Sequence, residues 1–206
     1  RQRPFTANRK RHVLRHDGAK DQALLTQFWP TRDGEDPVAM LELSLLERVV
    51  RIALTDTLRE ALGKAYSPGA SSSASRTWRG YGTFAITASV DVAQLGETRQ
   101  AIAATIAALR EKPISADLLQ RARAPMLEEF ENALKSNSGW LGYVDRAQTE
   151  PDRIERFLKA RERISAITSE RLQEVVRLYL GPDAAVEIDV LPNGVDEPIP
   201  LRAAGS

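Results

Sequence analysis

The stretch LREALGKAYSP, residues 58–68, joins the end of a predicted helix to the start of a predicted strand. Upstream of it, leucine and valine recur every three or four residues, which places them on one face of a helix over about residues 38–62. Asp36 suits the N-cap of this helix, and Pro37 suits its first position. Gly63 is the expected stop, because glycine readily adopts the left-handed backbone conformation that ends many helices.

The segment after this helix favours a β-hairpin with strands at about residues 65–73 and 81–91. The second strand alternates apolar residues with small or polar ones, as a half-buried strand does; its apolar positions are Phe84, Ile86, Ala88 and Val90. A disordered linker over residues 64–82 is the alternative, because serine and glycine are frequent there. The run SPGASSSAS, residues 67–75, favours either an edge strand to which an extended peptide adds or a flexible hairpin tip.

Strands gathered early and helices gathered later indicate an α+β fold, a two-layer domain with one mostly antiparallel sheet and helices on one face. Pro125 should kink or split the helix that contains it, because proline removes a helical hydrogen bond. We expect a single domain over residues 1–206, with its core at about 11–192. The other expected strands cover residues 12–16, 21–31 and 184–192; the other expected helices cover residues 92–110, 115–136, 140–148, 152–161 and a segment capped near Thr168.

Length and composition are those of an ordinary globular domain. The chain has 206 residues, a net charge of +1 and no cysteine, which argues against bulk attraction to nucleic acid and excludes disulfides and thiol chemistry. No apolar run approaches the roughly 20 residues that cross a bilayer, so we expect no membrane span. The chain does not begin with methionine, and we expect it to be a fragment of a longer protein.

The only two histidines, His12 and His16, lie in the stretch HVLRH. This pattern differs at one position from H-x-x-E-H, in which two histidines hold zinc and the glutamate activates water. Arginine stands in place of the glutamate, and a guanidinium neither accepts a proton nor binds a cation. The stretch also precedes a predicted strand, whereas the zinc motif needs a helix. We therefore expect no metal site and no catalytic residue in this segment alone.

Three stretches together resemble the non-catalytic C-terminal-type domains of the M16 zinc metallopeptidases, the pitrilysin and insulinase family. The first is LREALGKAYSP, which carries the pattern R-x-x-x-G-x-x-Y at Arg59, Gly63 and Tyr66. The others are ITSERLQEVVRLYL, residues 167–180, and SNSGWLGYV, residues 136–144. Together with the order of the elements, the resemblance covers about residues 11–192 and implies the LuxS/MPP-like fold of M16 peptidases.

The resemblance implies a substrate-binding domain that closes over a zinc-bearing domain of the same or a partner chain and forms a chamber for peptide substrates. Zinc would lie in that partner domain, and none in this one. Arg59 would hold the substrate backbone or orient Tyr66, and Tyr66 would donate its phenol proton to the scissile carbonyl oxygen. The parent protein would then be a zinc metalloendopeptidase, and location in the periplasm or cell envelope is an expectation from resemblance only.

Other interpretations of the same residues stay open. Arg59 is also typical of a solvated residue near a helix C-terminus, and Tyr66 of an aromatic residue on a rim. Trp140 and Tyr143 fit either a core or an interdomain contact. The alternatives for function are a purely structural, inactive M16-like subunit and an unrelated α+β binding module.

Overall fold

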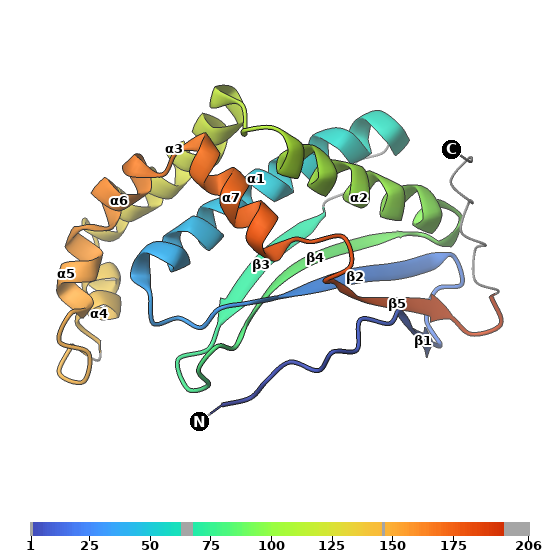
Figure 1. Cartoon of the computed structure of the whole chain (residues 1–206), viewed down its shortest axis with the longest axis horizontal. Coiled ribbons are helices and arrows are strands. Elements are labelled where there is room, and N and C mark those ends of the chain that lie inside the picture. Colours follow the sequence, from blue (N-terminus) through green and yellow to red (C-terminus); the bar gives the residue numbers. More distant parts are fainter. Residues whose placement is uncertain (1, 63–67, 146, 196–206) are drawn as a thin grey trace.

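A five-stranded sheet forms one layer of the molecule, and helices form the other (Figure 1). The computed structural model describes residues 2–62, 68–145 and 147–195. The sheet order is β1-β5-β2-β4-β3, and every neighbouring pair is antiparallel except β1 and β5, which run parallel. The strands are β1 His12–His16, β2 Gln22–Thr31, β3 Gly69–Ala74, β4 Gly82–Asp91 and β5 Val186–Pro192. The predicted α+β fold with a mostly antiparallel sheet is confirmed.

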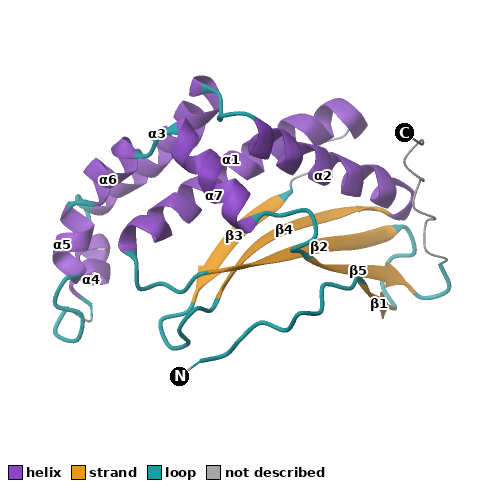
Figure 2. Ribbon diagram, viewed as in Figure 1, coloured by secondary structure: helices purple, strands orange, loops and turns teal. Residues whose placement is uncertain are grey.

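The helices all lie on one face of the sheet, and the opposite face has no helix over it (Figure 2). The side chains of Ser115 and Thr168 cap α3 and α7, as predicted from the sequence. Pro125 lies inside α3, but α3 continues past it, so the expected split into two helices is not observed. The helices are α1 Pro37–Leu62, α2 Leu95–Glu111, α3 Ala116–Ala133, α4 Asn137–Val144, α5 Arg153–Leu158, α6 Ala160–Ala166 and α7 Ser169–Tyr179, and a short 3-10 helix Val92–Gln94 precedes α2.

The register of the sheet separates a buried face from an open one. Leu25 lies opposite Ala88, and Trp29 lies opposite Phe84; all four are buried beneath the helices. Their neighbours along each strand point to the open face, because successive side chains of a strand alternate. The indole of Trp29 also donates a hydrogen bond to the Gly181 carbonyl at 3.0 Å, which ties β2 to the loop after α7.

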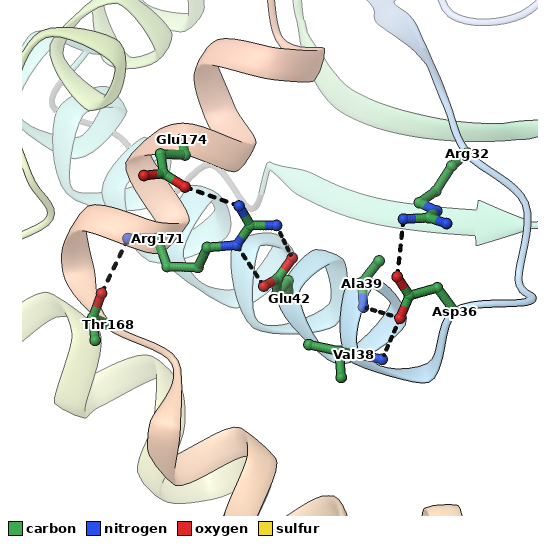
Figure 3. Close-up of polar contacts among 8 residues, drawn as sticks. All are labelled: Arg32, Asp36, Val38, Ala39, Glu42, Thr168, Arg171 and Glu174. Atoms are coloured by element: carbon green, nitrogen blue, oxygen red, sulfur yellow. Dashed lines mark hydrogen bonds and ion pairs between the residues drawn. The ribbon is translucent and has the colours of Figure 1, made fainter.

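An ion pair joins α1 to α7 beside this core (Figure 3). The Arg171 guanidinium donates to the two carboxylate oxygens of Glu42 at 2.7 and 3.0 Å, and to Glu174 at 2.8 Å. Glu42 is buried, whereas about half of the Arg171 side chain is exposed. The hydrogen bonds to Glu42 and Glu174 raise the pKa of the Arg171 guanidinium further above its ordinary value, so this side chain keeps its positive charge at any accessible pH.

A second network connects α2 to the last strand. Asp189 of β5 is fully buried and lies 2.8 Å from the Arg99 guanidinium of α2 and 2.5 Å from that of Arg11. Glu187, two residues earlier on the same face, binds Arg99 at 2.6 Å. Burial raises the pKa of the Asp189 carboxyl, while the two arginines oppose that shift. The network therefore places two carboxylates of β5 beneath α2, at positions where apolar side chains would be expected.

The loop between α4 and α5 is held by one carboxylate. Glu150 accepts hydrogen bonds from Arg76 of the β3–β4 turn, from Arg156 at 2.8 Å and from Arg153 at 3.3 Å. The hydrogen bond from Arg76, followed by those from the other two arginines, lowers the pKa of Glu150 from 4.5 to about 2. Glu150 thus fastens the α4–α5 loop to the turn of the hairpin.

Replacing Arg171 with alanine should lower the free energy of unfolding by about 2 kcal/mol, because the buried Glu42 carboxylate loses its bidentate partner. Urea denaturation followed by circular dichroism measures this change. Arg161→Ala is the control, since Arg161 pairs with Glu131 on the exposed surface, where an ion pair contributes less than about 1 kcal/mol. Equal effects of the two substitutions would contradict the structural role of the Glu42–Arg171 pair.

Glu150→Gln should change the pH dependence of stability. The folded-state pKa of Glu150 is lowered, so its carboxylate stabilises the folded chain above pH 4.5, and this contribution is lost as the pH falls toward about 2. The stability difference between wild type and Glu150→Gln is therefore largest at neutral pH and shrinks through that range. Denaturant melts at several pH values measure it, and a difference that stays constant with pH would rule out the lowered pKa.

Candidate functional site

Arg59 lies in the last turn of α1 and is the only basic residue of that turn. It is exposed, whereas Leu54 and Leu58 beside it are fully buried, so the guanidinium projects away from the core. Within the described part of the chain, Arg59 forms no ion pair. Arg48, further back on α1, instead donates to Glu129 of α3 at 2.6 Å.

The other predicted site residue, Tyr66, lies outside the described residues, as does Gly63. The structure describes the chain again from Pro68, and β3 begins at Gly69. The strand predicted after α1 is present, but it begins at Gly69, later than the predicted start at about residue 65. The pairing of Arg59 with Tyr66 stays a prediction.

Strand β3 is the edge of the sheet next to α1, and it is a regular strand paired with β4. The backbone N–H of Ser72 donates to the Glu47 carboxylate of α1 at 2.6 Å, and the Ser72 hydroxyl donates to the same oxygen. That N–H therefore points away from β4 and is already bonded. At the other end of the strand, the Gly34 N–H donates to the Ser75 carbonyl at 3.0 Å. Addition of a peptide strand to this edge would require Glu47 to move.

Three of the four acidic residues of α1 have structural partners in the part of the chain that the structure describes; the exception is the exposed Glu60. Glu42 binds Arg171, Glu47 binds Ser72, and Asp56 lies 3.2 Å from the Arg121 guanidinium of α3. No group of three or more metal-ligating side chains occurs among the described residues. These three carboxylates therefore hold the helix in place within the domain.

His12 and His16 lie in β1, and their side chains share the open face of the sheet. Four residues along a strand span about 13 Å, too far for two histidines to bind one metal ion. His16 is also engaged locally: its Nδ1 accepts from the Gly18 N–H at 2.9 Å, and its Nε2 lies 3.1 Å from the Gln22 carbonyl oxygen. The HVLRH stretch thus differs in geometry as well as in sequence from a helical zinc motif.

The open face of the sheet carries almost no charge. From the register, its residues are mainly threonine, serine, alanine and β-branched or aromatic apolar residues; Asp91 at the end of β4 and the two histidines of β1 are the only acidic or basic ones in the five strands. Leu14 of β1 is about half exposed on this face.

Comparison with known proteins identifies the fold. The sequence model of the peptidase M16 inactive domain matches residues 1–126. The chain belongs to this family. The predicted resemblance to the non-catalytic domains of M16 peptidases is therefore confirmed, and no curated protein sequence matches the chain.

Solved structures of this fold cover nearly the whole chain at low sequence identity. A protease from Helicobacter pylori has a TM-score of 0.75 and 14% identity, and the match covers 93% of this chain and 46% of that one. The periplasmic protease PqqL from Escherichia coli has a TM-score of 0.71 and 15% identity, over 93% of this chain and 21% of that one. This M16 domain thus spans less than half of the length of these relatives.

A third structure is described as the inactive peptidase domain of a putative zinc protease from Bordetella parapertussis. It has a TM-score of 0.68 and 19% identity, and the match covers 91% of this chain and 99% of that one. A domain of this fold has thus been solved by itself, whereas other relatives contain further domains. Within the described residues of the M16 domain, no helix is long and apolar enough to cross a bilayer.

Two features of the site were not found by sequence reasoning. The bond from Ser72 to Glu47 joins residues 25 apart, and Glu47 is only one of several acidic residues on α1. The three arginines around Glu150 come from two separate segments, the β3–β4 turn and α5. Neither contact follows from periodicity, although the excess of arginine near residues 150–163 is a weak signal of a charge network.

The isolated chain should not take up zinc with 1:1 stoichiometry at neutral pH, because β1 separates its two histidines. Isothermal titration with zinc chloride measures this directly, and His12→Ala serves as the matched control, with an unchanged titration. Tight binding that is lost on replacing either histidine would contradict the geometry of β1.

Proposed function

We propose that this M16 domain is the non-catalytic, substrate-binding half of a zinc metallopeptidase, and that it closes over a zinc-bearing domain of the same or a partner chain. The observation that carries the proposal is the exposed Arg59 guanidinium, without an ion pair in the described part of the chain, at the end of α1 next to the edge strand. The larger relatives of the same fold support the presence of a further domain.

In this proposal Arg59 binds the peptide backbone. Its planar guanidinium presents several N–H donors in fixed directions, so it can donate to two carbonyl oxygens of an extended peptide. The side chain begins at a rigid helix end anchored by the buried Leu58, which limits its freedom before binding. Arg59 therefore contributes to positioning of the substrate.

Tyr66 is proposed to act on the reacting carbonyl. Its phenol O–H would donate to the scissile carbonyl oxygen as negative charge develops there, which favours the transition state over the bound substrate. Zinc in the partner domain would activate the attacking water, since the described residues of this domain include no group of three or more side chains that could hold a metal ion.

The neutral open face of the sheet supports a peptide substrate of varied sequence. A chamber wall lined with threonine, serine and small apolar side chains allows contact with many side chains and repels neither sign of charge. The proposed specificity therefore rests on backbone contacts at Arg59 and Tyr66.

A structural subunit without a role in hydrolysis is the second candidate. The bond between Ser72 and Glu47 favours it, because it closes the middle of the β3 edge to an incoming peptide strand. The two candidates differ in what Arg59 and Tyr66 contribute to turnover.

In the parent peptidase, Tyr66→Phe should lower kcat about 100-fold, the effect of removing one donor to a developing oxyanion. Arg59→Ala should lower kcat/KM about tenfold, and Arg59→Lys should not restore it, because an ammonium lacks the planar fork. Steady-state hydrolysis of a fluorogenic peptide measures both, with thermal melts to verify folding.

Arg51→Ala is the matched control, since Arg51 is also an exposed arginine of α1, two turns before Arg59. It should leave turnover unchanged. Wild-type kinetics for Arg59→Ala and Tyr66→Phe together would assign the domain a structural role.

A further inference from the structure

Exposed apolar side chains gather on the two short helices α4 and α5. Of the eight large hydrophobic residues that are exposed in the described part of the chain, five lie on this pair. We call them the α4–α5 surface: Trp140, Leu141, Val144, Ile154 and Leu158. Leu141 is 67% exposed and Leu158 is 60% exposed. Such a concentration is typical of a contact surface, because single exposed apolar residues are otherwise scattered.

These two helices bury few side chains against the rest of the domain. No residue of α4 is buried, although most of its eight residues are apolar, and α5 buries only Phe157. Phe157 stacks on Tyr143 and contacts Phe130, in a small aromatic cluster separate from the main core. Helices of this length are not stable alone and depend on packing. The apolar side that faces outward is therefore available for a further partner.

The α4–α5 surface is nevertheless held in a fixed shape. The Trp140 indole donates to the Leu134 carbonyl at 2.9 Å, which orients the largest side chain of the surface. Arg153 donates to the carbonyls of Gly142 and Tyr143 at 2.8 and 3.1 Å, and so joins α5 to the end of α4. Glu150 fixes the loop between the two helices. A surface ordered in advance loses little entropy on docking.

Polar groups border the apolar ones. On α5 and the residues next to it, Lys159 pairs with Glu155 at 2.6 Å, and Arg156 pairs with Asp152 at 3.0 Å. An apolar centre with an aromatic residue and a charged rim is the usual anatomy of an interface between folded proteins.

We propose that the α4–α5 surface docks against the zinc-bearing domain of the parent peptidase. This inference rests on the proposed function. The length of the relatives supports a folded domain as the occupant, because this chain matches 46% of the Helicobacter pylori protease and 45% of a Pseudomonas fluorescens M16 protein, so each contains about as much protein again.

The docking surface and Arg59 lie at opposite ends of α1. A hollow of about 250 Å³ between α1 and this region is lined by Pro37 and Met40 from the start of α1 and by Tyr143 and Phe157 from the aromatic cluster. Arg59 lies 22 residues after Pro37 on α1, which corresponds to about 33 Å along the helix at a rise of 1.5 Å per residue. The two roles can therefore be perturbed separately.

Hydroxyl-radical footprinting with mass spectrometry tests the docking. Labelling of Trp140 and Leu141 should be at least fivefold slower in the parent peptidase than in the isolated chain, because the partner domain covers them. Leu178 of α7 is the matched control, since it is 68% exposed, and its labelling should be equal in both. Equal labelling of Trp140 in both proteins would overturn the proposal.

A substitution provides the second measurement. Leu141→Glu should leave the melting temperature of the isolated chain unchanged, since the side chain is already exposed, and should raise Trp140 labelling in the parent peptidase about fivefold by releasing the contact. Leu178→Glu should do neither. A dimer of the isolated chain in sedimentation that Leu141→Glu dissociates would assign the surface to a second copy and reject the zinc-bearing domain as its occupant.

Footprinting and turnover measured together distinguish failure of the docking proposal from failure of the proposed function. Protection of Trp140 together with normal turnover of Arg59→Ala and Tyr66→Phe would support docking and reject the substrate-binding role. Loss of turnover in those variants without protection of Trp140 would reject docking alone.

Discussion

Burial of α1 between the sheet and the other helices is the constraint on which the rest of the structure depends. Its apolar residues are buried on more than one side, because β3 lies beneath it and α2, α3, α6 and α7 lie against it. Truncating one such side chain in a core typically costs about 2 to 5 kcal/mol. Since α1 is fixed along its length, its last turn presents Arg59 at a defined place. Glu42, Glu47 and Asp56 also fix the helix in place, because they bind to α7, β3 and α3 respectively.

The sequence predicted the local elements well, because each has a local physical signal. Alternation between Phe84 and Val90 matches β4, and the capping residues Asp36 and Thr168 mark the starts of α1 and α7. Pro125 was predicted to kink or split its helix, and the split is not observed, because α3 continues past the hydrogen bond that proline removes. Residues 137–166 were predicted to form two short helices, and the structure has three there, because short helices carry too few repeats to define their ends.

Long-range contacts were beyond sequence reasoning. The ties from Arg171 to Glu42 and from Arg99 to Asp189 join residues about 90 to 130 apart, and no spacing indicates which charges will meet. For the candidate site, the roles of Arg59 and Tyr66 came from a family resemblance, since an arginine near a helix end is ordinary by itself. The structure adds that Arg59 is exposed, whereas the carboxylates of Glu42, Glu47 and Asp56 on the same helix have partners. Only coordinates show which of these charged side chains have partners.

The position of β5 between β1 and β2 has a consequence for synthesis of the domain. The first strand pairs only with the last, and His12 meets Ile188 across 176 residues of chain. During translation, β1 therefore stays unpaired until almost the entire domain has left the ribosome. Strands β2, β3 and β4 can pair with one another before that point. Pairing of β1 with β5 is thus a late step of folding, because the two strands are far apart in the sequence. Of the five strands, β1 is therefore exposed for the longest time to chaperones and to incorrect pairing.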